Sequence, residues 1–417
     1  MMHVVVLGAG VVGVTTAWYL AEAGHEVTVV DRQPAAALET SFANGGQISV
    51  SHAEPWANPS APLKILQWLG REDAPLLWRW RADARQWIWG LRFLRECTAG
   101  RTHANIVAIL RLALYSRAAL RELRIATDIE YDQLERGILH LYFDEREFEC
   151  AIPQAALMSR HGCDRVVKSV KECNDIEPAL AGSELNLVGG IFAASDESGD
   201  ACKFTQELAG RCARRGVMLR YGLSVDRLLQ EGGRISGVRM QGGEVLTADA
   251  YVTALGSYTP LLLRPLGIML PLVPAKGYSA TIPLRPDSVV PTVSLIDDQR
   301  KLVFSRLGDR LRVAGTAEFN GYDTSLNTVR CEALLERCLK LFPRAGGRGG
   351  VEFWAGLRPA TPGNRPIIGR TALPNLYINT GHGTLGWTMS CGSGRLLADL
   401  VSGRETEINA AEYALIN

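Results

Sequence analysis

The pattern of apolar and polar positions is clearest in the first thirty residues. The segment "HVVVLG" is a short, continuous apolar run, which is typical of a strand buried on both faces. The next segment, "VTTAWYLAEAG", predicts a helix, and "HEVTVVD" predicts a second buried strand. A strand, a helix and a second strand in this order predict the start of an α/β domain of the Rossmann type.

Glycines and one acid stand in this unit where a bound dinucleotide requires them. Gly8 makes the turn after the first strand, Gly10 lets the backbone approach a pyrophosphate, and Gly13 lets the helix pack closely on the strand. The N–H groups at the start of the helix then face the phosphates. Asp31 ends the second strand, where a carboxylate accepts hydrogen bonds from ribose hydroxyls and disfavours a 2′-phosphate. The pattern predicts a dinucleotide site.

A second glycine-rich segment, "GHGTLG" from Gly381 to Gly386, repeats the same glycine spacing near the C-terminus. No buried strand ending in an acid follows it, so it is not a second dinucleotide fingerprint. It leads into a predicted helix, "MSCGSGRLLADLVSG", whose N-terminus favours negative charge, such as that of a reduced flavin ring. We therefore interpret both segments as the two ends of one FAD site. The alternative is a loop that only turns the chain into its last helix.

Between these ends the predicted elements alternate in type. Residues from about 60 to 128 are predicted as helices, and "GILHLYFD" is predicted as a strand. A helix, "KFTQELAGRCARRG", then precedes a run of short strands with glycine-containing turns that ends in the buried strand "AYVTALG". A further helix is predicted in "TVRCEALLERCLKLFP".

Composition excludes several classes of protein. A chain of 417 residues with 47% hydrophobic residues predicts a large core and two domains, and a net charge of +1 gives no reason to expect nucleic acid. The nine cysteines form no C-x-x-C pair, so we expect reduced thiols of a cytosolic protein and no metal site. We expect no signal peptide, and prolines and Arg264 interrupt the longest apolar run. These features predict a cytoplasmic protein, either soluble or on the inner face of the cell membrane.

Several longer segments carry a family resemblance. They are "VVVLGAGVVGVTTAWYLAEAGHEVTVVDR", "ALETSFANGGQIS", "AYVTALGSYTP", "PAKGYSATIP", "WAGLRPATPGNRPIIGR" and "LYINTGHGTLGWTMSCGSGRLLADLVSGR". Over essentially the whole chain they resemble the bacterial FAD-dependent D-amino acid dehydrogenase small subunit, within the D-amino acid oxidase and glycine oxidase superfamily. The resemblance implies oxidation of D-amino acids to 2-oxo acids and ammonia, with hydride transfer from the α-carbon to flavin N5.

The resemblance also implies a discontinuous α/β fold, with a Rossmann-like FAD-binding domain interrupted by a substrate domain that has a mixed β-sheet. The predicted FAD-binding parts are residues 1–58, 190–262 and 350–417. The predicted substrate-domain parts are residues 59–189, with a helical insertion at 60–128, and residues 263–349.

The candidate substrate residues follow from the chemistry beside this resemblance. A planar guanidinium binds a carboxylate through two parallel hydrogen bonds, and Arg358 in "GLRPATP" matches the family's carboxylate-binding arginine. Its alternative role is a structural ion pair. Tyr278 and Tyr258 are candidates to line the pocket through their hydroxyls. His52 stands where the family pattern favours an aromatic residue, which leaves the side-chain preference open.

The candidate cofactor residues surround the two glycine-rich segments and the polar loop after Asp31. Lys276 is a candidate to bind near flavin N5 through water, and His382 to contact the ring by its backbone. No cysteine lies in "LRPATPGNRPIIGR", so we expect noncovalent FAD. The full predicted set is Gly8, Gly10, Val11, Val12, Gly13, Asp31, Arg32, Thr40, Ser41, Asn44, Gly45, Gly46, Gln47, Ile48, Val225, Gly256, Lys276, Gly381, His382, Gly383, Thr384, Leu385, Gly386 and Trp387.

Residues 76–94, "LLWRWRADARQWIWGLRFL", bear on where the electrons leave. Interleaved Trp and Arg suit a membrane interface, although an amphipathic core helix with its arginines in solvent explains the same pattern. No separate nicotinamide fingerprint exists, so the expected acceptor is a quinone, another carrier or oxygen. The alternatives left open are a glycine oxidase, a D-hydroxyproline dehydrogenase and a nonenzymatic FAD-binding electron-transfer subunit.

Overall fold

A six-stranded sheet holds the first predicted unit. In the computed structural model, which describes residues 1–68 and 70–415, β1 (His3–Leu7) and β2 (Glu26–Val30) pair in parallel, and α1 (Val11–Glu22) connects them. The sheet order is β19-β20-β13-β1-β2-β9, and only the pairing of β19 with β20 is antiparallel among the described residues. The other strands are β9 (Met218–Arg220), β13 (Ala250–Thr253), β19 (Ile367–Arg370) and β20 (Leu376–Thr380). This confirms the predicted Rossmann-type start of an α/β domain.

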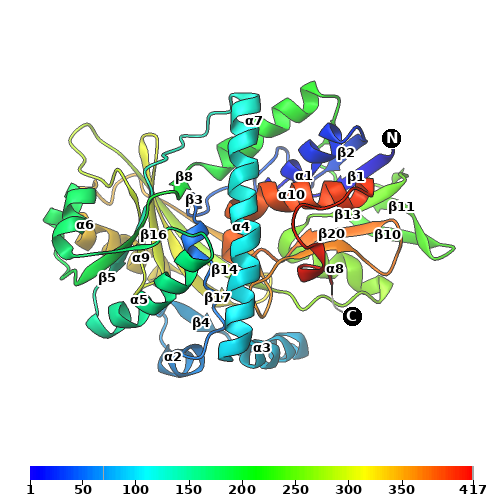
Figure 1. Cartoon of the computed structure of the whole chain (residues 1–417). Coiled ribbons are helices and arrows are strands. Elements are labelled where there is room, and N and C mark those ends of the chain that lie inside the picture. The colour runs from blue at the N-terminus through cyan, green and yellow to red at the C-terminus, as the bar shows by residue number, and fades with distance from the viewer. Residues whose placement is uncertain (69, 416–417) are drawn as a thin grey trace.

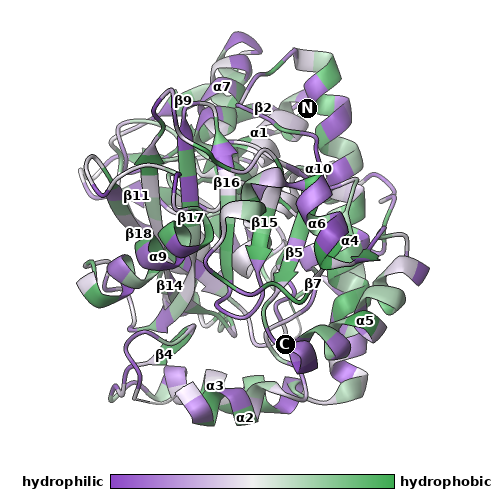
Figure 2. Ribbon diagram, turned by 90° about the vertical axis from the view of Figure 1, so that its left-hand side faces the viewer, coloured by the Kyte–Doolittle hydropathy of each residue, from purple (hydrophilic) through white to green (hydrophobic). Residues whose placement is uncertain are grey.

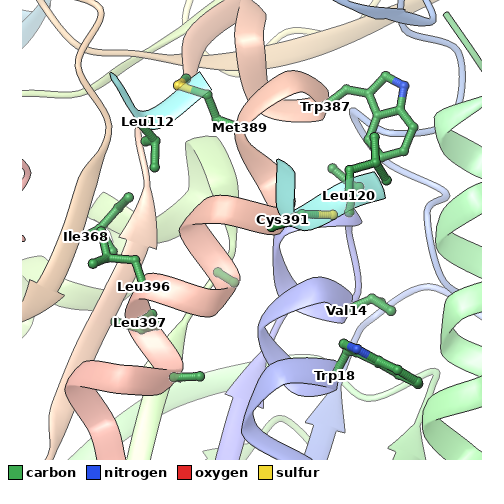
Figure 3. Close-up of a cluster of buried hydrophobic side chains, with 14 of the residues drawn as sticks. Val14, Trp18, Leu112, Leu120, Ile368, Trp387, Met389, Cys391, Leu396 and Leu397 are labelled. Atoms are coloured by element: carbon green, nitrogen blue, oxygen red, sulfur yellow. The ribbon is translucent and has the colours of Figure 1, made fainter. Parts of the chain in front are cut away.

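Four helices cover one face of this sheet. They are α1, α4 (Ala99–Thr127), α7 (Ala201–Arg214) and α10 (Gly386–Ser402), whose buried side chains form one hydrophobic cluster (Figures 1 and 3). A Cβ on Gly392 would lie 2.8 Å from the Cα of Ser116 in α4, and one on Gly394 would lie 2.8 Å from the backbone of Thr15 in α1. Glycine at these two positions therefore lets α10 pack closely between its neighbours.

A small antiparallel sheet of β10 (Val225–Glu231), β11 (Arg234–Met240) and β12 (Val245–Leu246) packs on the opposite face through a second apolar cluster. The predicted buried strands and helices at residues 3–30, 201–214, 250–253 and 328–341 are all present. The last predicted helix begins at Gly386, three residues before Met389, because the glycine-rich turn leads directly into it.

The second half of the fold is a larger mixed sheet with the order β18-β14-β17-β16-β15-β5-β7-β6, to which β4 adds beside β17. Figure 1 shows it on the other side of the long helix α4. Its strands are β4 (Leu76–Trp78), β5 (Ile138–Tyr142), β6 (Val166–Lys168), β7 (Gly189–Ala193), β14 (Val273–Pro283), β15 (Ser294–Asp297), β16 (Leu302–Leu307), β17 (Arg310–Phe319) and β18 (Glu352–Ala360). The helix α9 (Thr328–Leu341) packs on one face of this sheet.

Shorter elements complete the fold. They are β3 (Gln47–Ile48) and β8 (Glu197–Ser198), which pair with each other, the helices α2 (Ala61–Trp68), α3 (Ala84–Glu96), α5 (Glu145–Arg160), α6 (Val170–Ile176) and α8 (Thr259–Leu263), and the 3-10 turns η1 (Val50–His52), η2 (Pro178–Gly182), η3 (Gly256–Tyr258), η4 (Arg264–Leu266), η5 (Gly383–Leu385) and η6 (Ala410–Glu412).

Two sequence-based expectations need comment. The prediction of helices throughout residues 60–128 was wrong at Leu76–Trp78, which form a strand because they extend the larger sheet in parallel beside β17. The predicted domain boundary between residues 349 and 350 precedes β18, and β18 pairs with β14 in the larger sheet. The division into domains stays a prediction.

Candidate active site

A cavity of about 1350 Å³ lies between the two large sheets, at the carboxyl ends of the parallel strands. Small-ligand pockets usually measure about 300 to 1,000 Å³, so this cavity has room for a dinucleotide together with a substrate. All four candidate substrate residues and most of the candidate cofactor residues line it. The predicted site residues outside its lining are Gly13, Ile48, Lys276 and Gly381.

The nucleotide end of the cavity is a cradle that larger side chains would fill. Gly8 has a φ of +109°, and a Cβ there would lie 2.6 Å from the carbonyl oxygen of Ala254. A Cβ on Gly13 would lie 1.9 Å from the carbonyl oxygen of Gly8, so this glycine acts through close packing below the cavity wall. Gly10 precedes α1, whose first turn contributes Val11 and Val12 to the lining. Main-chain N–H groups at the start of a helix, with no side chain in front of them, can bind a pyrophosphate.

Asp31 and its neighbours form the wall beside this cradle. The Asp31 carboxylate accepts hydrogen bonds from the N–H groups of Ala9 at 2.6 Å and Gln33 at 2.8 Å. Burial raises the pKa of Asp31, and these two hydrogen bonds oppose the rise. Arg32 forms an ion pair with Glu39 at 2.7 Å. The wall continues through Val225 and Gly256.

The loop after Asp31 follows the cavity floor toward the larger sheet. The Ser41 hydroxyl accepts a hydrogen bond from the N–H of Val11 at 3.0 Å, and the Thr40 hydroxyl donates to the carbonyl of Leu357 at 2.9 Å. A Cβ on Gly45 would lie 2.4 Å from a methyl group of Val303, so the loop rests directly on β16. Asn44, Gly46 and Gln47 also line the cavity, whereas Ile48 is buried in the core and does not.

The C-terminal glycine-rich segment lines the opposite part of the cavity with main chain. His382 turns its side chain inward, where Nε2 lies 2.8 Å from the Ser393 hydroxyl on α10. Burial lowers the pKa of His382 to about 3, so the imidazole is neutral. The η5 turn contributes Gly383, Thr384 and Leu385 to the lining, and α10 begins at the next residue with Gly386 and Trp387. Gly381, with a φ of +83°, lies just behind this wall.

Arg358 is a partly buried cation on the cavity wall. Its Nη1 donates to the carbonyl of Thr316, and its Nη2 donates to the carbonyl of Gly315 at 3.3 Å. No carboxylate of the described residues 1–68 and 70–415 forms an ion pair with it. Burial, and then the charge of Arg330, lower the pKa of Arg358 to about 10, so it remains a cation at neutral pH. The alternative role of a structural ion pair is therefore not supported.

A β-bulge in β17 creates this arginine site. The pairing of β14 with β17 shifts by one residue between Lys276 and Tyr278, and Thr316 has a left-handed backbone with a φ of +54°. A bulge redirects the main chain locally, and here two successive carbonyls bind the guanidinium. The guanidinium crosses Gly277, where a Cβ would lie 2.3 Å from Cζ and Nη2. Local sequence patterns did not reveal either Thr316 or Gly277, because the bulge depends on pairing between distant strands.

The two candidate tyrosines line the cavity, but the Tyr278 hydroxyl does not have the predicted role. The Tyr278 hydroxyl donates to the Glu318 carboxylate, which lies outside the cavity lining, and burial raises the pKa of Tyr278. Tyr258 lies at the nucleotide end, where the Arg32 guanidinium stacks 4.1 Å above its ring.

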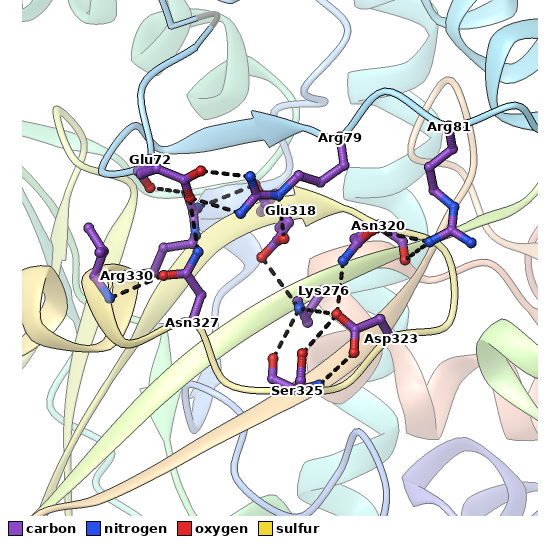
Figure 4. A network of polar contacts seen from close by, with 12 residues as sticks. Glu72, Arg79, Arg81, Lys276, Glu318, Asn320, Asp323, Ser325, Asn327 and Arg330 are labelled. Atoms are coloured by element: carbon purple, nitrogen blue, oxygen red, sulfur yellow. Dashed lines mark hydrogen bonds and ion pairs between the residues drawn. The ribbon is translucent and has the colours of Figure 1, made fainter.

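Lys276 points away from the cavity, which corrects the prediction that it approaches the flavin ring. Its ammonium lies 3.4 Å from Glu318 and 3.2 Å from Asp323, and it donates to the carbonyl of Ser325 at 3.0 Å (Figure 4). Successive residues on a strand point to opposite faces of the sheet. Gly277 lies on the face that lines the cavity, so the side chain of Lys276 points to the other face. Sequence alone did not show which of the two faces would be the cavity side.

A polar chamber extends the cavity on the side of His52. The His52 and His140 rings are stacked with their centroids 6.2 Å apart, and burial lowers the pKa of His52 to about 3. His140 binds Asp298 through Nδ1 at 2.9 Å and Ser51 through Nε2 at 2.8 Å. Lys301 completes the chamber 3.0 Å from Asp298. Of these residues only His52 was predicted from the sequence, because the others come from η1, β5 and the turn between β15 and β16 without a common motif.

Comparisons with known proteins agree with this architecture. Residues 3–400 match the family described as FAD dependent oxidoreductase. The chain is 62% identical over 410 residues to a D-amino acid dehydrogenase of Dechloromonas aromatica (strain RCB), covering 97% of this chain and 98% of that protein. It is 57% identical over 409 residues to a D-amino acid dehydrogenase of Paramagnetospirillum magneticum (strain ATCC 700264 / AMB-1), covering 98% and 97% of the two chains.

The solved structure of glycine oxidase from Bacillus cereus ATCC 14579 has the same fold, with a TM-score of 0.77, 22% identity and coverage of 100% of this chain and 99% of that one. The cradle at Gly8 to Gly13 and the cavity size fit an FAD, which Asp31, the loop at residues 40–47 and the segment at residues 382–387 would hold. The enzyme prediction is confirmed, so the nonenzymatic alternative is set aside. The chain belongs to the family of FAD-dependent oxidoreductases, and it uses FAD as its cofactor.

Proposed function

We propose that this enzyme oxidises D-amino acids to 2-oxo acids and ammonia and passes the electrons to a quinone. The observation that carries the substrate assignment is Arg358, a partly buried cation on the cavity wall that binds only main-chain carbonyls among the described residues. A buried charge is costly unless a counter-charge reaches it, and a substrate carboxylate is such a counter-charge. The relatives named D-amino acid dehydrogenase support the choice of enantiomer.

Arg358 positions the substrate. A guanidinium has five N–H donors, and two of the Arg358 nitrogens each give one donor to the carbonyls of Thr316 and Gly315. The remaining donors bind the substrate carboxylate in a fixed plane, because the bulge in β17 and Gly277 hold the guanidinium from below.

FAD, when bound, would supply the two-electron oxidising chemistry by accepting the hydride of the substrate α-carbon. The substrate reacts with its amine neutral, after the ammonium proton has passed to water. Loss of the hydride then leaves a protonated imino acid, which water hydrolyses to the 2-oxo acid and ammonium. The walls of the cavity exclude bulk water and hold the substrate in place. The reaction therefore requires no protein side chain to act as a general base.

Anaerobic bleaching of the flavin by a panel of D- and L-amino acids tests this function. We expect D-amino acids to bleach the flavin and the L-enantiomers to leave it oxidised. Bleaching by glycine or D-hydroxyproline alone would favour those alternatives instead. No bleaching by any amino acid would overturn the proposal.

The acceptor assignment depends on an exposed apolar surface over α2 and α3, which we call the α2–α3 surface. Figures 1 and 2 show these two helices at the lower edge of the molecule. Trp80, Leu63 and Leu91 are 72%, 68% and 69% exposed. The surface consists of Leu63, Leu66, Trp80, Trp87, Ile88, Leu91 and Leu94. Exposed arginines border it at positions 81, 85, 92 and 95.

Apolar side chains bordered by arginines fit the interface of an anionic membrane. The inner sides of the same elements reach the cavity, because Ile65, Leu76 and Phe93 line it. A quinone dissolved in the bilayer therefore has a short route to the flavin. No helix among residues 1–68 and 70–415 is long and apolar enough to cross a membrane, so we propose contact with one face of the bilayer.

The structure divides the tryptophans of residues 76–94 between core and surface. Trp89 is only 4% exposed and donates to the carbonyl of Ala360, so its replacement would disturb folding. We therefore choose Trp80, Trp87 and Leu91, all changed to Ser, for flotation on anionic liposomes. Ile125→Ser is the matched control, because Ile125 is 84% exposed and lies near the other end of α4.

We expect the wild type and Ile125→Ser to float, the triple variant to remain at the bottom, and flotation to weaken in high salt. Reduced enzyme should transfer electrons to a soluble quinone analogue faster than to oxygen. Absence of wild-type flotation, together with equal reoxidation by oxygen and quinone, would reject this acceptor and indicate an oxidase.

A further inference from the structure

The cavity floor runs from Arg358 toward the polar chamber along one face of the larger sheet. The residues that line it alternate along β5, whereas residues 314–317 of β17 all line it where the strand bulges. They include His140 and Tyr142 in β5, Ile296 in β15 with Asp298 just beyond it, Val303 in β16 with Lys301 just before it, and Ala314 and Thr316 in β17. The chamber and the arginine site thus belong to one continuous surface.

Lys301 lies close to the bulge that holds Arg358. Leu302 pairs with Gly315, and the N–H of Thr316 donates to the carbonyl of Lys301 at 3.4 Å. Neighbouring strands lie about 4.8 Å apart, so the backbone of Lys301 is one strand spacing from the carbonyl that binds the guanidinium. Lys301 and Arg358 therefore line neighbouring parts of the same cavity floor.

The Lys301 ammonium has N–H donors that its ion pair with Asp298 does not use. Nζ lies 3.0 Å from one oxygen of Asp298, an ammonium has three donors, and the side chain is 46% exposed on the cavity wall. The other oxygen of Asp298 is taken by His140. The two remaining acids of the chamber are bound by cations, Glu54 by Arg165 at 2.8 Å and Glu147 by Lys64 at 2.9 Å. Each of these two acids therefore already has a cation partner.

The backbone at this position does not favour a lysine. Lys301 has a φ of +55°, in the left-handed region that glycine and asparagine adopt most easily. Lys301 is the last residue of the short connection between β15 and β16, where a glycine would adopt the positive φ with less strain. Residues held in rarely populated backbone conformations concentrate at functional sites. A lysine in this conformation therefore points to a functional role for its side chain.

We propose that Lys301 binds the end of the substrate side chain, and that it gives the enzyme a preference for D-amino acids whose side chain ends in a carboxylate or amide oxygen. This specificity role rests on the proposed function, because Arg358 must first bind the α-carboxylate. The ammonium donates a hydrogen bond to the oxygen of a D-glutamate or D-glutamine side chain, which an aliphatic side chain of the same length cannot accept.

The first test compares D-glutamate with D-norvaline, whose side chain has the same length without the oxygens. The enzyme variants are Lys301→Met, which keeps the length and removes the charge, and Lys301→Gly, which also relieves the backbone. The matched control is Lys203→Met, because Lys203 forms an ion pair with Asp132 outside the cavity. We expect both Lys301 variants to reduce the ratio of kcat/KM for D-glutamate to that for D-norvaline by about tenfold or more, and Lys203→Met to leave it unchanged.

The second test needs no turnover. Glutarate offers a second carboxylate at the position of the side-chain end, whereas valerate has a methyl group there, and the binding of both can be followed by the change in flavin absorbance. We expect Lys301→Met to weaken glutarate binding by about tenfold relative to valerate. Equal losses for the two acids would overturn the role of Lys301.

The two proposals fail in different ways. If D-norvaline and the other D-amino acids do not bleach the flavin of the wild type, the proposed function fails. If D-norvaline bleaches it, and the D-glutamate to D-norvaline ratio is the same in the wild type and in both Lys301 variants, the function holds and the specificity role is overturned.

Discussion

Replacing Gly277 with alanine should displace Arg358 without disturbing the FAD site. An alanine Cβ would lie 2.3 Å from Cζ and Nη2 of Arg358 and 2.6 Å from Nη1. Carbon atoms in contact normally lie about 3.5 Å apart, so the guanidinium must move by roughly 1.2 Å. The φ of Gly277 is not positive, so the backbone itself accepts alanine and the strain falls on the arginine.

A displacement of about 1 Å in a positioning group costs on the order of 100-fold in rate, or about 2.7 kcal/mol. We therefore expect Gly277→Ala to lower kcat/KM for D-amino acids about 100-fold. FAD content and its visible spectrum should be unchanged, because Gly277 lies on β14, apart from the glycine-rich segments proposed to hold the cofactor.

The matched control is Gly210→Ala in α7, where the nearest atom to an added Cβ is 3.9 Å away. This variant should keep full activity and gain a little stability, because alanine favours a helix. The assay is steady-state oxidation of D-amino acids with a dye acceptor, after Tm and flavin content have been measured for each variant. A folded, FAD-containing Gly277→Ala enzyme with wild-type kcat/KM would refute the placement of Arg358 over Gly277.

Three further predictions follow from the same structure. Arg358→Lys keeps the charge but loses the paired donors, so apparent substrate affinity should fall by about 1 to 3 kcal/mol with FAD retained; unchanged kinetics would remove Arg358 from the site. Denaturation should release intact FAD, because no cysteine lies in "LRPATPGNRPIIGR"; flavin that stays with the precipitate would contradict noncovalent binding. Burial lowers the pKa of His382 from 6.5 to about 3 in the folded state, so between these values the unfolded chain binds the extra proton. His382 thus makes the free energy of unfolding fall by about 1.4 kcal/mol per pH unit as the pH drops from 6.5 toward 3, and urea unfolding at pH 7 and pH 5 should show a smaller loss for His382→Gln; an equal loss would contradict its burial as a neutral side chain.

Short-range features of the chain were predictable from the sequence. The unit from β1 to β2, with Gly8, Gly13 and Asp31, depends on apolar periodicity and on glycine spacing within thirty residues. These are local properties, because a buried strand and the start of its following helix impose their pattern on adjacent residues. The C-terminal glycine-rich segment and its helix were found for the same reason.

Contacts between distant strands determined the rest of the site, and only the tertiary structure shows them. Neighbouring residues on a strand point to opposite faces, so sequence could not place Lys276 in a polar network and Gly277 beneath Arg358. The bulge at Thr316 arises from the pairing of β14 with β17, and Lys301 reaches the site because β16 pairs beside that bulge. Pairing register depends on the packing of a whole sheet rather than on any local motif, which is why the sequence alone determined the cofactor end of this enzyme and the tertiary structure decided its substrate end.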